Sequence, residues 1–160
     1  MDYQATIQSQ RNISMFIDTV KILKELETLP KYENQIGLQT VAGMDDPFYA
    51  TGRITDKNHS EEEFTQFCFD LPYTNSVISS LGMYRTRVMM LSPKTCYTYH
   101  QDLCKRIHIP LITNDNCFII VDKEVIHLPA DGKHYVVDTT KPHTAVNASR
   151  EKRVHIVGCI

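Results

Sequence analysis

The chain lacks the long apolar runs that membrane-spanning helices require. Among its 160 residues, the longest such runs lie at residues 88–91 and 118–121, whereas a helical span of a bilayer takes about 20 apolar residues. The N-terminus also lacks the basic and apolar regions of a secretory signal. We therefore expect a cytoplasmic protein, and the length suits a single domain with one sizeable core.

The cysteine pattern and the small net charge argue against further classes of protein. The five cysteines are odd in number and include no Cys-x-x-Cys pair, so a disulfide framework or a structural zinc site is a poor interpretation. We expect buried, reduced thiols instead. A formal net charge of −2 gives no reason to expect a nucleic-acid partner, although it leaves room for a local basic pocket.

Helix signals are confined to the first half of the chain. They predict three helices, at residues 11–29, 60–69 and 74–81. The first has apolar residues at helical spacing ahead of Pro30, and its stripe is expected to pack on the core. The second opens with a capping box of Ser60 and Glu63, and its acidic first turn is interpreted as a solvated face. The third is expected to end at Gly82.

From Met83 onward the pattern changes to short runs rich in Val, Ile, Thr and Tyr, separated by turn residues. These runs predict eight strands, at residues 84–91, 96–99, 105–112, 116–121, 124–128, 134–137, 144–148 and 153–159. Closely spaced strands of this kind favour a sandwich, jelly roll or barrel. The expected layout is therefore mostly helical support at residues 1–82 and a β-rich core at residues 83–160, with one further possible strand at residues 36–41.

The sequence His100-Gln101-Asp102 is the first sign of chemistry. Side chains two residues apart point to the same side of an extended chain, so an imidazole and a carboxylate can converge there on one metal ion. His143, which lies 43 residues after His100 and beyond several predicted strands, is the best third ligand. Two histidines and one carboxylate leave open positions, which non-haem iron(II) enzymes use to bind a co-substrate and O₂ together.

Two later strands each combine an arginine with a histidine. Arg106 and His108 alternate with aliphatic residues, and Arg153 and His155 do so near the end of the chain, so each pair shares one strand face. An arginine on the inward face of a barrel is unfavourable unless it meets an anion. Because the guanidinium fork matches a carboxylate, we expect Arg153 to bind a dicarboxylate co-substrate rather than an acid on the surface.

Several other histidines and cations show no sign of a chemical role. A lone histidine more often fills a structural position than a metal site, and most lysines and arginines lie on the surface. We assign such structural or surface roles to His59, His127, His134, Arg85, Arg87, Arg150 and Lys152. For Arg85 and Arg87, the alternative is a place at the entrance of the site.

Two parts of the sequence together resemble the aspartyl/asparaginyl β-hydroxylase family. The first is HQDLCKRIHIPL, which begins at His100, and the second is KPH, which ends at His143, with the segment TAVNASREKRVHI after it. This family also takes in bacterial free-proline cis-hydroxylases. Its pattern is a proximal histidine, often with a carboxylate two residues on, then an Arg-x-His strand, a distal histidine and an arginine ten residues beyond it. Here Arg153 stands ten residues after His143. The resemblance covers roughly residues 85–160.

The resemblance implies a double-stranded β-helix (jelly roll, cupin-like) with N-terminal supporting α-helices, which makes the protein mainly β. It also implies that Fe(II) is bound by His100, Asp102 and His143. Arg153 would bind the distal carboxylate of 2-oxoglutarate, which His108 would also contact. Arg106 would face either this co-substrate or an anionic group of the substrate.

These roles are those of a 2-oxoglutarate-dependent dioxygenase, an oxidoreductase that would hydroxylate an amino acid or an amino-acid residue of a peptide or protein. Succinate and CO₂ would be released. Asp102 leaves no obvious place for a halide ligand, so we expect hydroxylation rather than halogenation. The alternatives are a cupin-like module that binds a metal or small molecule without turnover, and a zinc hydrolase or isomerase. Free amino acids, peptidyl Asp, Asn or Pro and small metabolites are all open as substrates.

Overall fold

The computed structural model describes residues 15–160 of the protein. Five helical segments lie in the first half: α1 (Thr19–Leu26), the 3₁₀ helices η1 (Pro47–Ala50), η2 (Ile54–Asp56) and η3 (Glu61–Glu63), and α2 (Pro72–Ser80). Three short strands accompany them: β1 (Gln35–Gly37), β2 (Gln39–Thr40) and β3 (Gln66–Phe67). The strands after α2 are β4 (Tyr84–Leu91), β5 (Thr95–Cys96), β6 (Arg106–Ile112), β7 (Cys117–Val121), β8 (Glu124–Ile126), β9 (Tyr135–Val137), β10 (His143–Asn147) and β11 (Arg153–Cys159).

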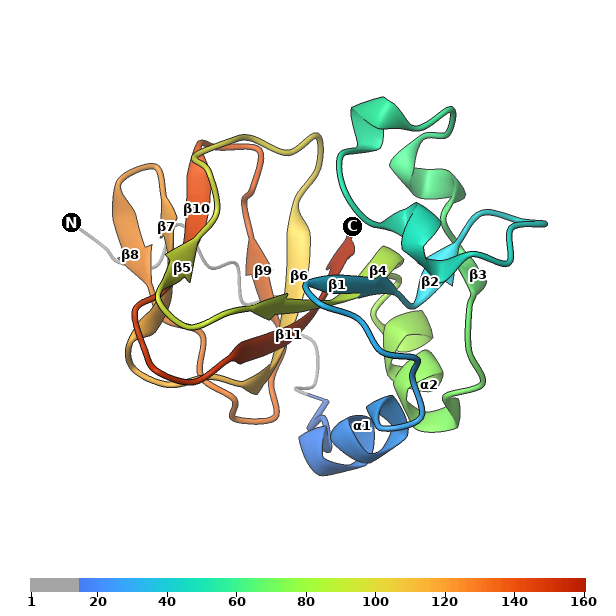
Figure 1. Cartoon of the computed structure of the whole chain (residues 1–160), viewed down its shortest axis with the longest axis horizontal. Coiled ribbons are helices and arrows are strands. Elements are labelled where there is room, and N and C mark those ends of the chain that lie inside the picture. Colours follow the sequence, from blue (N-terminus) through green and yellow to red (C-terminus); the bar gives the residue numbers. More distant parts are fainter. Residues whose placement is uncertain (1–14) are drawn as a thin grey trace.

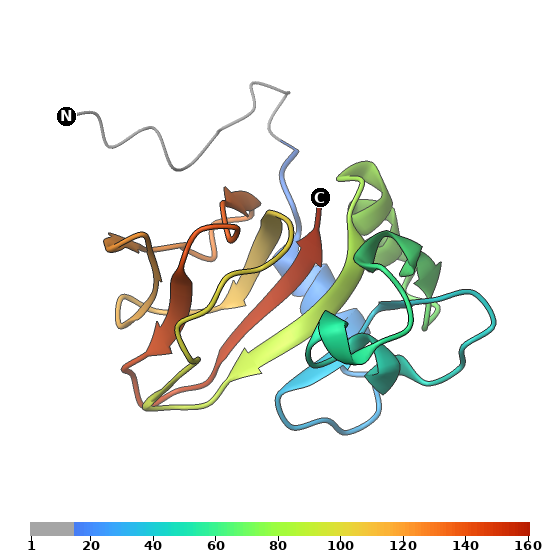
Figure 2. The same cartoon turned by 90° about the horizontal axis from the view of Figure 1, so that it is seen from above.

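Strands β4 to β11 form two antiparallel sheets (Figures 1 and 2). The larger sheet has the order β1-β4-β11-β6-β9, and the smaller has the order β5-β10-β7-β8. The consecutive strands β4 and β5 belong to different sheets: β4 pairs with β11 in the larger sheet, and β5 pairs with β10 in the smaller one. This is the double-stranded β-helix, or jelly roll, and it confirms the predicted fold class. All eight predicted strands are present, two of them with the predicted bounds.

The main apolar core lies on the face of the larger sheet that α1 and α2 cover (Figure 1). Val88, Ile109 and Ile156 of three neighbouring strands pack there with Ile22 of α1 and Ile78 of α2. Because side chains alternate across a strand, the residues between these aliphatics point to the opposite face of the sheet. That opposite face carries the polar residues of β4, β6 and β11.

Helix α1 begins later than the predicted helix at residues 11–29, of which 11–14 lie outside the described residues. Asp18 caps it, and its Oδ1 accepts from the Lys21 amide at 3.1 Å. Phe16 lies before this cap and Val20 lies in the first turn of α1; both are exposed, whereas Ile22 is buried.

The predicted helix at residues 60–69 is wrong. The Ser60 amide does donate to Glu63 Oε2 at 2.6 Å, as the capping box requires, but only the turn η3 follows before the chain extends into β3. Phe64 is fully buried and Glu61 is 4% exposed. These two side chains fix the turn against the body of the protein, and β3 then pairs with β2 instead of continuing a helix.

Helix α2 agrees with the third predicted helix and ends before Gly82, whose φ of 63° suits glycine after a helix C-terminus. Its first turn starts at Pro72 and is capped by a side chain of α1. The Glu25 carboxylate accepts from the Tyr73 and Thr74 amides, each at 2.8 Å. This contact joins the two helices that cover the core.

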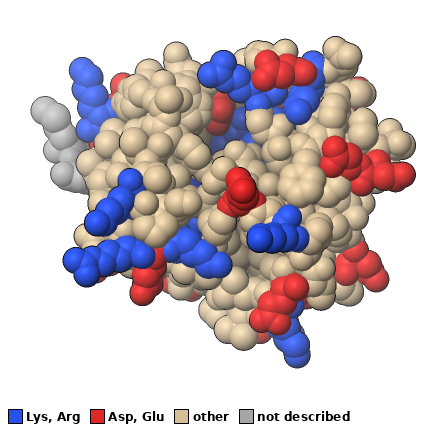
Figure 3. Space-filling model, viewed as in Figure 1, with Lys and Arg blue, Asp and Glu red and all other residues tan. Residues whose placement is uncertain are grey.

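Neither α1 nor any other helix within residues 15–160 has the length and apolar character that a bilayer span requires. Side chains of both charge signs are spread over the face seen in Figure 3. The five cysteines are free; Cys117 and Cys159 are buried, as expected, whereas Cys96 is exposed.

Candidate functional site

A cavity of about 500 Å³ lies between the two sheets. Its walls come from β4, β6 and β11 of the larger sheet, from β7 and β10 of the smaller one, and from the segment around η2. The six predicted site residues all line it: His100, Asp102, Arg106, His108, His143 and Arg153. The jelly-roll topology thus brings the two halves of the sequence motif into one space.

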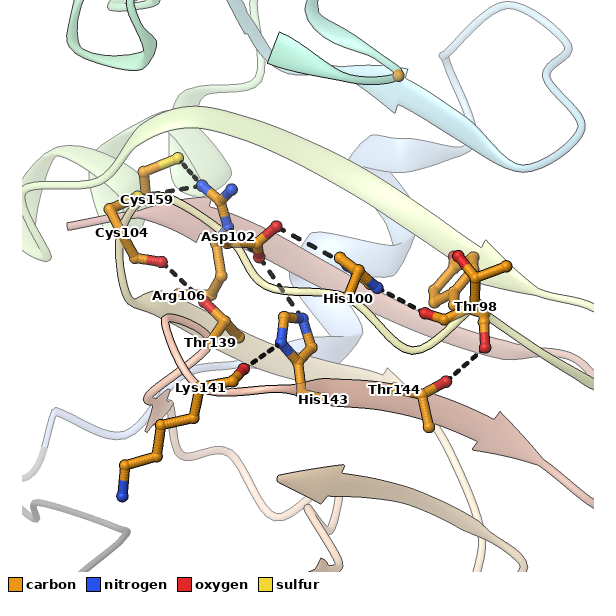
Figure 4. Close-up of polar contacts among 12 residues, drawn as sticks. Thr98, His100, Asp102, Cys104, Arg106, Thr139, Lys141, His143, Thr144 and Cys159 are labelled. Atoms are coloured by element: carbon orange, nitrogen blue, oxygen red, sulfur yellow. Dashed lines mark hydrogen bonds and ion pairs between the residues drawn. The ribbon is translucent and has the colours of Figure 1, made fainter. Parts of the chain in front are cut away.

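Backbone pairing places the two candidate histidine ligands opposite each other. The His100 amide donates to the His143 carbonyl at 3.0 Å, and the His143 amide donates back at 2.8 Å. Their rings consequently lie 4.3 Å apart. The Asp102 amide donates to the Thr139 carbonyl at 2.8 Å, and the Asp102 carboxylate points toward both imidazoles (Figure 4).

The donor atoms of these three side chains lie within 4.8 Å of one another. The distances from the Asp102 oxygens to Nε2 are 3.8 Å for His100 and 3.6 Å for His143. Each Nδ1 is held by a carbonyl, that of Thr98 at 2.6 Å and that of Lys141 at 2.9 Å. Because a carbonyl only accepts, each Nδ1 carries the proton, and the lone pair on Nε2 is free for a metal ion.

The protonation state of His143 also suits a metal ligand. Burial lowers the pKa of His143, and the nearby His100 and Arg106 act in the same direction, against the opposing effects of the Lys141 carbonyl and Asp102. The imidazole is therefore neutral near pH 7, as coordination requires. His100 lies at the open side, with 41% of its side chain exposed.

Arg106 lies behind Asp102 (Figure 4). Its Nε donates to Asp102 Oδ2 at 3.0 Å, and its two terminal nitrogens donate to Glu61 at 2.6 and 3.1 Å. Burial opposes ionisation of Glu61, but hydrogen bonding and the charge of Arg106 lower its pKa to about 2. Arg106 therefore orients the Asp102 carboxylate. Its expected contact with a co-substrate or substrate anion stays a prediction, since its partners here are carboxylates of the chain.

Glu61 also forms a second group of potential metal ligands with Cys104 and Cys159, whose ligand atoms again lie within 4.8 Å of one another. Arg106 Nη1 donates to all three side chains. The guanidinium group thus occupies the position that an ion would need.

Arg153 and His108 lie on the floor of the cavity. Arg153 is 2% exposed, and its Nε and Nη1 have no hydrogen-bond partner among residues 15–160. His108 Nδ1 is 3.2 Å from Nδ1 of His155. Burial, with the charge of Arg153, holds the pKa of both histidines well below the usual range, so both are neutral. An unpaired buried guanidinium beside neutral imidazoles is an environment that favours an anion.

Sequence reasoning missed several residues of the cavity. Glu61, interpreted as part of a solvated face, is buried, and the surface role favoured for Arg85 and Arg87 is wrong because they are only 2% and 6% exposed. The signal was available, since both arginines alternate with Thr86 and Val88 along one strand. Tyr97 was also missed; its hydroxyl is buried without a partner in the described part of the chain.

The topology and the site together define a jelly-roll protein with a His-Asp-His group inside the barrel. Residues 18–158 match the family model for aspartyl/asparaginyl beta-hydroxylase. The chain therefore belongs to the aspartyl/asparaginyl β-hydroxylase family, which confirms the resemblance. Membership implies a hydroxylase of the 2-oxoglutarate oxygenase type.

Two solved structures are similar to parts of this chain. The plu4264 protein from Photorhabdus luminescens is 14% identical with a TM-score of 0.38, over 45% of this chain and 57% of that one. A cupin domain (bp2299) from Bordetella pertussis Tohama I is also 14% identical, with a TM-score of 0.41, over 47% of this chain and 78% of that one. The match thus spans little more than half of the first structure. No curated protein matches the chain.

Proposed function

We propose that the protein is an Fe(II)- and 2-oxoglutarate-dependent dioxygenase that hydroxylates an amino acid or an amino-acid residue of a peptide or protein. One observation carries the proposal: three side chains whose donor atoms could hold one metal ion, and a buried arginine without an ion pair in residues 15–160, line the same cavity. The family match is continuous over residues 18–158, which supports one catalytic domain.

In this proposal, His100, Asp102 and His143 hold the metal. The Nδ1 atoms of both imidazoles contact backbone carbonyls, which leaves Nε2 to face the metal, and Arg106 holds the Asp102 carboxylate in place. The donor set of two histidines and one carboxylate is that of non-haem iron(II) oxygenases. When bound, Fe(II) with 2-oxoglutarate supplies the O₂-dependent hydroxylation chemistry, with release of succinate and CO₂.

The co-substrate would lie toward the cavity floor. Arg153 donates to the distal carboxylate, which gives its buried guanidinium group the anionic partner that residues 15–160 do not provide. Tyr97 lines the same cavity, and its hydroxyl, which has no partner in the described part of the chain, donates to the same carboxylate. His108, neutral and beside Arg153, contacts the co-substrate without adding charge.

The direct test is formation of succinate from 2-oxoglutarate by the purified protein with Fe(II) in air. Free amino acids and short peptides containing Asp, Asn or Pro are added as candidate substrates. We expect at least one of them to stimulate succinate release, with consumption of O₂. The variant His143→Ala, which lacks one proposed ligand, should release none above background.

Two results would contradict the proposal. Normal iron binding without O₂-dependent succinate formation under any condition would favour a metal-binding module without turnover. Conversion of an added compound in the absence of O₂, with zinc in place of iron, would favour a hydrolase or isomerase.

A further inference from the structure

Four buried arginines line the cavity: Arg85, Arg87, Arg106 and Arg153. Two of them are neutralised by carboxylates of the chain. Arg85 donates to Glu61 at 3.1 Å, and Arg106 bonds Glu61 and Asp102. Within residues 15–160, neither Arg87 nor Arg153 forms an ion pair. The cavity thus holds two buried positive charges that the protein leaves uncompensated.

Arg87 resembles Arg153 in its lack of partners. It is 6% exposed and its Nε has no hydrogen-bond partner among the described residues. Its one side-chain hydrogen bond within residues 15–160 is donated from Nη1 to Gln35 Oε1 at 3.2 Å. Burial, with the charges of Arg85 and Arg106, lowers the pKa of Arg87 to about 10, so the group remains a cation at neutral pH. A buried cation without an anion is unfavourable unless a ligand supplies one.

A structural role does not account for Arg87. The backbone of β1 already pairs with that of β4, with Gly37 opposite Arg87 and Gln35 opposite Met89. The contact between Arg87 and Gln35 therefore adds little to the pairing of β1 with β4. An apolar side chain of similar length would fill the same volume without the desolvation cost of a charge.

The backbone of Arg87 lies at a different level of the larger sheet from that of Arg153, although the charges of both arginines act on Tyr97. Arg87 of β4 stands opposite Val157 of β11, whereas Arg153 of β11 stands opposite Leu91 of β4. These two levels of the sheet are four residues apart, which corresponds to about 13 Å along the strand. The charge balance also favours a second anion in the cavity. A bound divalent metal would add further positive charge, and the co-substrate brings only two carboxylates.

We propose that Arg87 is the residue that binds a carboxylate of the substrate, with Gln35 orienting its guanidinium group. The substrate class is then a compact carboxylic acid, whether the group is the α-carboxylate of a free amino acid or the side-chain carboxylate of an acidic residue. This inference rests on the proposed function for the identity of the site. The anion-binding property itself does not depend on turnover.

The first test measures thermal unfolding of the metal-free protein. Arg87→Met removes an uncompensated charge and should raise the unfolding midpoint by about 2–4 °C. The matched control is Arg85→Met, two residues away on the same strand face, which removes a charge paired with Glu61 and should lower the midpoint. Sodium propionate, compared with sodium chloride at equal ionic strength, should stabilise the wild type more than Arg87→Met.

The second test uses turnover. Acids in the succinate-release panel are compared with their amides, which have the same shape without the charge. We expect the wild type to prefer the acid at least ~100-fold in kcat/KM, because an amide leaves the buried charge unpaired. In Arg87→Met the acid should fall to the level of its amide through KM, and Arg87→Lys should restore part of the preference. The requirement for 2-oxoglutarate should not change.

The outcomes separate this inference from the proposed function. The inference is overturned if Arg87→Met raises the requirement for 2-oxoglutarate and keeps the preference for acids, or if it lowers the unfolding midpoint and leaves the propionate effect unchanged. If the wild type forms no succinate at all, the proposed function fails, while the propionate comparison still decides whether Arg87 binds carboxylates. Free amino acids and acidic peptides in the panel distinguish the two sources of the carboxylate.

Discussion

At the scale of single residues, the geometry of the candidate metal site is determined by partners outside it. The carbonyls of Thr98 and Lys141 orient the two imidazoles, and Arg106 orients Asp102. Arg106 is itself held by Glu61 on the distant turn η3. These contacts hold the three donor side chains in place, which would reduce the reorganisation that metal binding requires.

Asp102→Ala tests the carboxylate ligand. We expect iron affinity and succinate formation to fall by at least ~10–100-fold, with the fold intact because Arg106 keeps its bonds to Glu61. Equilibrium iron binding and circular dichroism measure the two effects. Asp115→Ala, at an exposed position, is the control. Unchanged iron binding and turnover would remove Asp102 from the site.

Arg153→Met tests the co-substrate clamp. We expect the 2-oxoglutarate concentration needed for half-maximal turnover to rise at least ~100-fold, because a buried charge pair is lost, while the requirement for iron changes little. Steady-state kinetics with each component varied in turn gives both numbers. The exposed Arg150→Met should behave like the wild type. Equal effects on both requirements would show that Arg153 has a structural role.

Local spacing predicted some of these residues and not others. His100 and Asp102 stand two apart on an extended segment, so their convergence followed from chain geometry. Glu61 gave no such signal, because its burial depends on Arg85 and Arg106, which are far along the chain. Arg87 was misjudged because arginine is rarely buried, and only the polar interior of the barrel makes it an exception.

At the scale of elements, the strands were predictable because aliphatic and polar side chains alternate along the longer ones, such as β6 and β11. The helices were less predictable from the sequence. A capping box can open a helix, but at η3 the burial of Glu61 and Phe64 outweighed the helical pattern of the next residues. At α1, the cap at Asp18 moved the start of the helix and changed which apolar residues are covered.

The turn η3 is predicted to connect the N-terminal half to the barrel through a pH-dependent ion pair. Glu61→Gln leaves Arg85 and Arg106 without their carboxylate and should lower the free energy of unfolding at pH 7 by about 3 kcal/mol. The folded-state pKa of Glu61 is about 2, below its ordinary value of 4.5. Its contribution is therefore complete above about pH 4.5 and is lost as the pH falls toward 2.

Urea unfolding at a series of pH values measures this difference. The gap between wild type and Glu61→Gln should be constant near neutral pH and should close below pH 4.5. The neighbouring exposed residue provides a matched control, Glu62→Gln, which should unfold like the wild type throughout. A gap that stays constant down to pH 2 would contradict the ion-pair account.

At the scale of the whole molecule, the two faces of the larger sheet have different roles in the jelly roll. One face carries aliphatic residues under α1 and α2 and forms the core. The other face carries the arginines and histidines that line the cavity. The core and the candidate site thus use alternate residues of β4, β6 and β11, and Arg106, His108 and Arg153 of the sequence pattern belong to the second set.

The most direct measurement is an anaerobic titration of the wild-type protein with Fe(II) and then with 2-oxoglutarate, followed by visible absorption. The proposal predicts a weak charge-transfer band that saturates at one iron per chain and appears only when both components are present. Tight iron binding without any band on addition of 2-oxoglutarate would contradict the proposal that this site binds iron and 2-oxoglutarate together.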